Sequence, residues 1–271
     1  MTATLRDAIS PDLRTTLRAL KLGQMLATLP DRLTLARQQK MTHADFLELV
    51  LADEVTRREA KSASLRARAA GLDPAMRLDT WDESAAVRYD RQLWNELASL
   101  RFLVGPHGAV ILGPVGVGKT HLACALGHIA IRRRRTVHMA SAGKLFKRLK
   151  AARLDNTLDY EMRRLATVEL LILDDFALQP LDAAETADFY QLCVERHQRA
   201  STVATSNRTA EEWLSMMADP LLAQSAVDRL ASTAHELIIE GESYRRRQKP
   251  AISHHRGTSI DQKNGDHHDH S

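Results

Sequence analysis

The sequence predicts an α/β fold in which helices flank a parallel sheet, with a small helical domain on its N-terminal side. Three observations favour this fold. Residues 113–120 form a glycine-rich loop between an apolar run and a helix, residues 170–175 are an apolar run that ends in two aspartates, and residues 108–245 alternate short apolar runs with helices. Such alternation builds a parallel sheet whose faces are covered by helices.

The composition limits the function classes. Of 271 residues, 44% are hydrophobic, so a sizeable core is possible, and the net charge of +4 suits a polyanionic partner. Aromatic residues make up only 4%, which argues against a protein that stacks single-stranded bases. No apolar stretch approaches the length of a membrane span and no signal peptide opens the chain, so we expect a cytoplasmic protein without a membrane partner. Cys124 and Cys193 lack metal-ligand spacing and are expected to be buried thiols.

Residues 1–70 are expected to form an all-helical domain. Apolar residues recur at helical spacing in two runs. The first is Leu13, Leu17 and Leu20, and the second is Leu22, Met25, Leu26 and Leu29. Pro30 is expected to end the second run. Thr42 and Asp45 have the spacing of a capping box and open a second, long helix. Gly71 is expected to end that helix.

The far end of this long helix is basic. Residues 1–70 carry 12 lysines and arginines against 8 aspartates and glutamates. Five of the basic residues cluster together: Arg57, Arg58, Lys61, Arg66 and Arg68. One interpretation is a domain that binds the phosphates of double-stranded DNA with little sequence specificity and strong salt dependence. The other is a solvated helix face, because basic residues are favoured near a helix C-terminus.

The rest of the chain divides into three parts. Residues 71–107 are expected to be a linker and a helix that leads into the core. Residues 246–271 are polar and rich in histidine, and are predicted to be disordered. Between them, residues 108–245 should hold five strands: Val110–Leu112, Val137–Met139, Leu170–Leu173, Val203–Thr205 and Leu237–Ile239.

The glycine-rich loop fits the pattern G-x-x-x-x-G-K-[ST] that binds nucleotide phosphates. Its glycines let backbone N–H groups turn toward phosphate oxygens, and the following helix adds its positive N-terminal end. Lys119 would contact the β and γ phosphates of ATP, and the hydroxyl of Thr120 would bind Mg²⁺. The expected nucleotide-binding residues are Gly113, Pro114, Val115, Gly116, Val117, Gly118, Lys119, Thr120 and His121.

A pair of carboxylates completes the expected site. The apolar run that starts at Val168 ends in Asp174 and Asp175. Ligands bind at the carboxyl edge of a parallel sheet, which is where a strand over this run would place both side chains. We expect Asp174 to hold Mg²⁺, directly or through water, and Asp175 to polarise the water that attacks the γ-phosphate.

Several runs in a fixed order resemble one protein family. They are Gly-Pro-Val-Gly-Val-Gly-Lys-Thr-His-Leu-Ala at 113–123, Leu-Leu-Ile-Leu-Asp-Asp-Phe at 170–176, Thr-Ser-Asn-Arg at 205–208, Glu-Glu-Trp at 211–213, Asp-Arg-Leu at 228–230 and Gly-Glu-Ser-Tyr-Arg at 241–245. The chain resembles the IstB-like helper ATPases of bacterial insertion sequences, relatives of the DnaC helicase loader in the initiator branch of AAA+ proteins. The resemblance implies that residues 108–245 are an AAA+ ATPase domain.

The resemblance also implies roles for single residues. Asn207 would be the polar sensor that orients the attacking water or contacts the γ-phosphate, and Arg229 would complete the site of a neighbouring subunit. The role of Arg245 stays undecided. Two positions depart from the family pattern: Ala177 replaces a glycine, and Asp175 replaces the glutamate of many AAA+ proteins, which puts the rate of hydrolysis in question.

Four functions remain open. The first is an ATP-dependent helper that assembles as a homo-oligomer on double-stranded DNA and hands a target to a cognate transposase. The second is a replicative helicase loader of the DnaC type. The third is a nucleotide-switched DNA-binding scaffold with negligible turnover. The fourth is a small-molecule P-loop kinase, against which Asn207 and Arg229 count.

Overall fold

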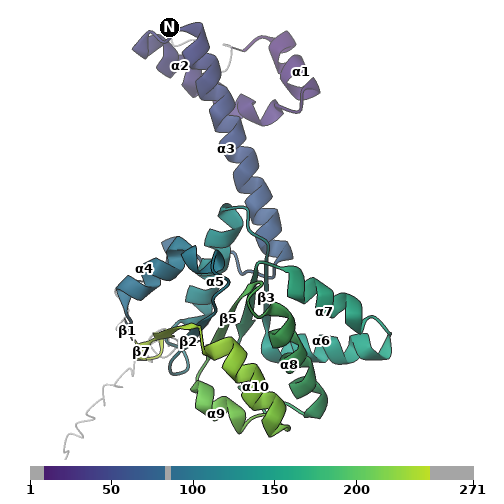
Figure 1. Ribbon diagram of the computed structural model, residues 1–271. Coiled ribbons are helices and arrows are strands. Elements are labelled where there is room, and N and C mark those ends of the chain that lie inside the picture. Colours follow the sequence, from purple (N-terminus) through teal and green to yellow (C-terminus); the bar gives the residue numbers. More distant parts are fainter. Residues whose placement is uncertain (1–8, 83–86, 245–271) are drawn as a thin grey trace, which may run out of the picture.

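A computed structural model describes residues 9–82 and 87–244 (Figure 1). Arg245 and the tail 246–271 lie outside the described residues. The long helix α3 projects from an α/β body and carries the N-terminal helices at its far end. Within the described ranges, no helix is long and apolar enough to cross a membrane.

The α/β body contains a five-stranded sheet in which every pair of neighbouring strands is parallel. The strand order is β3-β4-β5-β2-β6. The bounds are β2 Ala109–Leu112, β3 Val137–Ser141, β4 Leu170–Asp174, β5 Ser201–Ser206 and β6 His235–Ile238. The five predicted strands are present, although the last begins two residues earlier than expected and ends before Ile239.

Two layers of helices cover the sheet, as the sequence predicted. Alternate residues of each strand face opposite layers, so Leu170 and Ile172 belong to one buried cluster while Leu171 and Leu173 belong to the other. One layer holds α4, α5 and the end of α3, and the other holds α6 to α10. The bounds are α4 Arg91–Ser99, α5 Lys119–Arg132, α6 Ala142–Leu154, α7 Leu158–Thr167, α8 Ala183–Arg196, α9 Ala210–Leu214 and α10 Pro220–Ala231.

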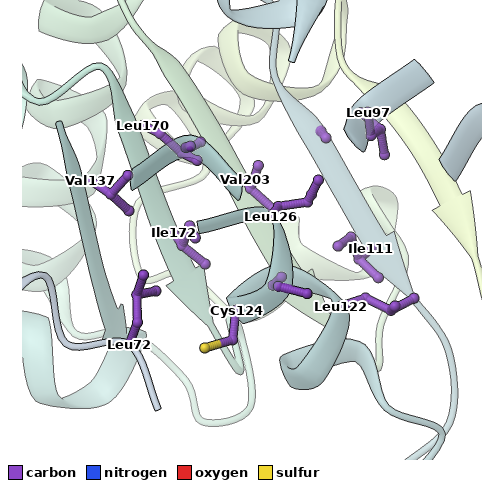
Figure 2. Packing of buried hydrophobic residues seen from close by; sticks show 14 of the residues in the cluster. Leu72, Leu97, Ile111, Leu122, Cys124, Leu126, Val137, Leu170, Ile172 and Val203 are labelled. Atoms are coloured by element: carbon purple, nitrogen blue, oxygen red, sulfur yellow. The ribbon is translucent and has the colours of Figure 1, made fainter. Parts of the chain in front are cut away.

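Helix α5 is packed on nearly every side. Figure 2 shows its residues Leu122 and Leu126 among Ile111, Ile172 and Val203 of the sheet. These five side chains are fully buried. The expected thiols Cys124 and Cys193 are also buried, and burial raises the pKa of both above that of an ordinary cysteine. The helix that follows the glycine-rich loop is therefore fixed rigidly against the sheet.

The N-terminal part is helical, as expected, with α1 Pro11–Ala19, the 3₁₀ helix η2 Gly23–Ala27, α2 Leu29–Gln39 and α3 His43–Ala69. The capping box of Thr42 and Asp45 is present. Two details differ from the sequence analysis. Pro30 lies in the first turn of α2, where a missing N–H costs nothing, so it stands at the start of a helix that begins at Leu29. Leu13 and Leu20 are exposed, and Leu17 alone of that run is buried.

The end of α3 belongs to the core of the α/β body. Ala67, Ala70 and Leu72 are buried in the same cluster as α5. Gly71 follows the helix with φ +84°, and a Cβ at this position would lie 2.5 Å from the Met139 carbonyl oxygen. Gly71 therefore permits both the left-handed turn and the close approach to β3.

The linker crosses one side of α5 before the sheet begins. It contains the 3₁₀ helix η3 Leu78–Thr80 and the short strand β1 Val87–Arg88, which pairs antiparallel with β7 Glu240–Gly241. After α4, the 3₁₀ helix η4 Arg101–Leu103 leads to the sheet. The pairing of β1 with β7 brings the linker together with the segment that follows β6.

Candidate nucleotide site

The glycine-rich loop lies at the carboxyl edge of the sheet, between the end of β2 and the start of α5. Gly118 is the N-cap of α5, and no side chain caps this helix end. The first N–H groups of a helix have no partner within the helix and carry its positive dipole end. The loop and helix therefore have the features of an anion site, and phosphate binding by these residues stays a prediction.

Two glycines of the loop have conformations and contacts that exclude a side chain. Gly116 has φ +88°, and a Cβ there would lie 2.1 Å from the Ser243 hydroxyl oxygen. Gly118 has φ +101°, and a Cβ would lie 2.6 Å from the ring of Trp81. Both positions need glycine for backbone shape and for space.

Lys119 points back along the loop. Its Nζ donates hydrogen bonds of 2.8 Å to the carbonyl oxygens of Gly113 and Pro114, and the residue is 7% exposed. These carbonyls hold the ammonium group within the loop. Phosphate oxygens are stronger acceptors for a charged donor than neutral carbonyls, so a bound triphosphate would compete for this ammonium.

Asp174 and Thr120 come together, as the metal prediction requires. Thr120 lies close enough to the Asp174 carboxylate to lower its pKa. The hydroxyl of Thr205, on the adjacent strand β5, also donates to Asp174 Oδ1 at 2.6 Å. Burial raises the pKa of Asp174, and the charge of the neighbouring Asp175 adds to this shift. A divalent cation would offset both effects by stabilising the ionised form.

Asp175 is exposed at the same edge of the sheet. Its backbone has φ +53°, and its N–H donates to the Thr205 hydroxyl at 2.9 Å. Ala177 also has a positive φ, of 55°. This conformation favours glycine, which gives a physical reason for the glycine that the family pattern has at this position.

Asn207 follows directly after β5, and its side chain is exposed. Because β5 lies between β4 and β2, Asn207 emerges between the strand that ends in Asp174 and the strand that precedes the loop. The next turn is held by Trp213, whose ring N–H donates to Ser206 Oγ and to the Arg208 carbonyl. These bonds join the run at 211–213 to the run at 205–208. The sensor role of Asn207 stays a prediction.

Arg229 does not join these residues. It lies in the last turn of α10, which leads to the start of β6, at the opposite edge of the sheet. Its guanidinium donates to the Ser225 carbonyl and hydroxyl and lies 5.8 Å from the centre of the Tyr190 ring. There it lines a pocket of about 400 Å³ together with Cys193. Arg229 is therefore placed away from the nucleotide site of its own chain.

The five predicted DNA contacts differ in their surroundings. Arg57 and Arg58 both pair with Glu54, which is 4% exposed, and Arg58 also donates to the Lys21 carbonyl. The pairs lower the pKa of Glu54 to about 2, with the hydrogen bond from Arg57 as the largest cause. The side chains of Lys61, Arg66 and Arg68 make no hydrogen bond or ion pair with other described residues.

Sequence analysis missed the aromatic contacts over the loop. The ring of Trp81 is 5.3 Å from that of His121 and 6.1 Å from that of Tyr89, in both cases edge to face. His121 is in turn joined to the linker, because its Nε2 lies 2.7 Å from the Arg77 carbonyl oxygen. The N–H of Tyr244 donates to the Gly116 carbonyl from the other side. No local pattern signals these contacts, which join segments far apart in sequence.

The residues present fit a nucleoside triphosphate with Mg²⁺. Gly116 and Gly118 have no side chain where other segments approach the loop most closely, no side chain caps the helix end, and Lys119 supplies a cation. Among the residues that the structure describes, no three His, Cys, Asp or Glu side chains converge on one point. Mg²⁺ accepts few protein ligands and takes phosphate oxygens and water as the others, so Thr120 and Asp174 suffice.

The family model and similar known proteins point to the same family. Residues 15–251 match the family described as IstB-like ATP binding protein. A protein of Mycobacterium tuberculosis, whose name describes an ATP-binding protein in an insertion sequence, is 35% identical over 241 residues, covering 89% of this chain and 96% of its own. A protein of Pseudomonas aeruginosa, named as an ATP-binding protein of insertion sequence IS21, is 32% identical over 238 residues, covering 88% and 90%.

Solved structures share the fold at low sequence identity. The structure of DnaI is 21% identical with a TM-score of 0.51, covering 60% of this chain and 90% of its own. The AMPPCP-bound DnaA from Aquifex aeolicus is 22% identical with a TM-score of 0.50, covering 61% and 50%. The α/β body is thus a P-loop fold of the AAA+ type, as the sequence predicted.

Proposed function

This chain belongs to the family of IstB-like ATP-binding proteins, and from that premise we propose that it is an ATP-dependent helper of insertion-sequence transposition. It assembles on double-stranded DNA as a homo-oligomer, hydrolyses ATP with Mg²⁺ and presents the DNA to a transposase. The observation that carries the ATPase part is the convergence of Thr120 and Asp174 beside Lys119. The names of the relatives support the transposition part.

Each residue has a distinct task in hydrolysis. The loop N–H groups and Lys119 bind the phosphates, and Thr120 and Asp174 would hold Mg²⁺, which neutralises charge that develops on the phosphate oxygens. Asp175 accepts a proton from, or orients, the attacking water, and Asn207 fixes that water against the γ-phosphate. Arg229 of one subunit acts on the nucleotide of the next subunit, since it lies far from its own.

Two alternatives share the same nucleotide site and differ in partner or in turnover. A DnaC-type helicase loader would have a helicase as its partner, and the matches to insertion-sequence proteins favour the transposase instead. A nucleotide-switched scaffold would bind ATP and DNA with negligible turnover. The short, exposed side chain of Asp175 keeps this second alternative open.

Two variants and a matched control separate these functions. Lys119→Ala should lose ATP binding and ATP-dependent retention on DNA, because the loop loses its one cation. Asp175→Asn should bind Mg-ATP, release phosphate roughly 10²–10⁴-fold more slowly and stay on duplex DNA longer. Asp155→Asn changes an exposed aspartate at the end of α6 and should behave as wild type.

The measurements are nucleotide affinity, phosphate release and the lifetime of the protein on duplex DNA. Tight ATP binding by Lys119→Ala would contradict the nucleotide site. Negligible phosphate release by the wild type with DNA present would favour the scaffold. Adding the transposase of the same insertion sequence should shorten the lifetime of the protein on DNA, whereas no response to it would contradict the helper role.

A further inference from the structure

A basic groove of about 770 Å³ lies where the C-terminal half of α3 passes the end of α5. Three structural units line it: α3, the linker and α5 with the residues just after it. The arginines that line it are Arg58, Arg66, Arg77, Arg132 and Arg134. Among the described residues that line it, Glu59 is the one acidic side chain. The groove thus carries an excess of positive charge that comes from both parts of the molecule.

Several of these arginines have unused hydrogen-bonding capacity. Arg66 and Arg132 make no side-chain hydrogen bond or ion pair within the described part of the chain. The Nε of Arg77 is buried and has no hydrogen-bond partner among the described residues. An unpaired buried donor costs free energy, so a movement of the Arg77 side chain toward a phosphate would break no Nε hydrogen bond with the described residues.

Small side chains make up much of the lining of the groove. Ala60, Ala63 and Ala67 of α3 lie in its lining with the serines Ser62 and Ser64. These small side chains leave room between the arginines. A groove of this volume with cations from three structural units suits an extended chain of phosphates, whereas a small anion needs an enclosed site with convergent donors.

The dipoles at helix ends explain the positions of some of the groove arginines but not of all. Arg66 and Arg132 each lie in the last turn of a helix, where a cation is favoured by the dipole. Arg77 is in the linker, outside both helices. The dipole of neither helix therefore accounts for Arg77 in the same groove.

We propose that this groove binds the phosphate backbone of duplex DNA, an inference that rests on the proposed function and assigns a surface to it. The contact is made jointly by α3 and by the ATPase body. Arg66, Arg77 and Arg132 are its main contacts. Lys61 and Arg68, which belong to the basic cluster of the sequence, do not line the groove and contribute less.

The position of the groove also connects DNA with the nucleotide site. Helix α5 runs from Lys119 in the loop to Arg132 in the groove. Two histidines on α5 hold the linker: His121 contacts the Arg77 carbonyl, and His128 Nε2 lies 2.8 Å from the Asp73 carbonyl oxygen. Phosphates that engage Arg77 and Arg132 therefore act on the helix and the linker that border the nucleotide. We expect DNA to stimulate ATP hydrolysis through this groove.

Two double variants of equal charge test the assignment. Arg66→Gln with Arg132→Gln removes two groove cations, and Lys61→Gln with Arg68→Gln removes two exposed cations of α3 outside the groove. None of the four side chains is ion-paired with another described residue, so neither variant breaks an internal ion pair. Affinity for a labelled random-sequence duplex is measured across a salt series with a non-hydrolysable ATP analogue, and thermal melting and nucleotide affinity confirm that both variants are folded.

The groove variant should lose roughly two units of the log–log salt slope and most of the stimulation of phosphate release by DNA. The control variant should keep nearly the wild-type slope and stimulation. Equal losses in the two variants, or a wild-type slope in the groove variant, would overturn the groove assignment while leaving the proposed function standing. A wild type that binds no duplex DNA at low salt would overturn both.

Discussion

The hydroxyl of Thr205 donates to Asp174 Oδ1 at 2.6 Å and accepts the N–H of Asp175 at 2.9 Å. One fully buried side chain on β5 therefore fixes both aspartates at the end of β4. A partner of this kind orients a metal-binding carboxylate, and its loss weakens metal binding even though the ligand itself is unchanged.

Thr205→Val should reduce Mg²⁺-dependent ATP hydrolysis by roughly 10–100-fold. Valine has nearly the shape of threonine but cannot donate to Asp174 or accept from Asp175. The stability of the protein should fall by about 1–3 kcal/mol, because buried polar atoms lose a partner. Phosphate release at several Mg²⁺ concentrations measures the first effect, and denaturant melting the second. Thr205→Ser keeps the hydroxyl and should retain most activity; equal losses in both variants would show that packing at this position matters as much as the hydroxyl, which would contradict the assignment.

Asp174→Asn should make the nucleotide-free protein more stable while it abolishes Mg²⁺-dependent hydrolysis. Burial, reinforced by Asp175, raises the pKa of Asp174, so its ionised form opposes folding at neutral pH. Removing this charge should stabilise the nucleotide-free protein by roughly 0.5–2 kcal/mol, and each kcal/mol should raise its Tm by about 2–4 °C.

The stability gain should depend on pH in a defined direction. Between the ordinary pKa of 3.8 and the raised folded pKa, the folded state holds a proton that the unfolded state has released. The gain therefore grows through this range as pH rises, is full above the folded pKa and vanishes below 3.8. Thermal melts from neutral to acid pH check this. Asp175→Asn, at an exposed position, should show little gain; a loss of stability in Asp174→Asn would mean that the carboxylate is needed for folding.

Local signals in the sequence were enough for the strands and for the glycine-rich loop. Four apolar residues before Gly113 and an apolar run before Asp174 specify buried strands, and the loop pattern specifies its own conformation. Pro30 shows the limit of such signals, because a proline that cannot continue a helix is also favoured at the start of one. The packing of the helix that contains Pro30 decides between these two roles of the proline.

The partners of the site residues could not be predicted, because they depend on the order of strands in the sheet. Thr205 reaches Asp174 since β5 lies beside β4, and Tyr244 reaches Gly116 since β6 lies beside β2. Both contacts join residues that are far apart in sequence. The sequence predicted which residues do chemistry, and the tertiary structure shows which ones hold them in place.

Trp81 should report nucleotide binding by its fluorescence. The chain has three tryptophans, of which Trp94 and Trp213 are buried while Trp81 is partly exposed against Gly118 and His121. Titration with ATP should change the emission, and Trp81→Phe should remove that change. The affinity of Trp81→Phe for a labelled nucleotide should fall by less than about tenfold, since one aromatic contact contributes roughly 0.5–1.5 kcal/mol. Trp94→Phe is the matched control; loss of the signal in that variant would contradict the assignment.

Arg229 lies at the amino edge of the sheet, and the loop with Lys119 lies at the carboxyl edge, across strands such as β2 that are roughly 13 Å long. An arginine side chain that is also bonded to Ser225 does not reach the nucleotide of its own chain. If Arg229 stabilises the charge on the γ-phosphate, it acts on a neighbouring subunit. An arginine supplied in this way contributes roughly 10³–10⁵ in rate in P-loop enzymes.

Arg229→Ala should therefore bind ATP normally but hydrolyse it at least about 10³-fold more slowly. Hydrolysis per subunit in the wild type should rise with protein concentration and with DNA that promotes assembly. Arg199→Ala, an exposed arginine near the same edge, is the matched control and should stay active. The decisive measurement mixes Arg229→Ala with Lys119→Ala. An interface that joins the intact loop of the first variant to the intact arginine of the second is complete, so the mixture should recover activity that neither variant has alone. If the two variants co-assemble and the mixture stays as inactive as its parents, Arg229 supports the structure of α10 and the shared site is wrong.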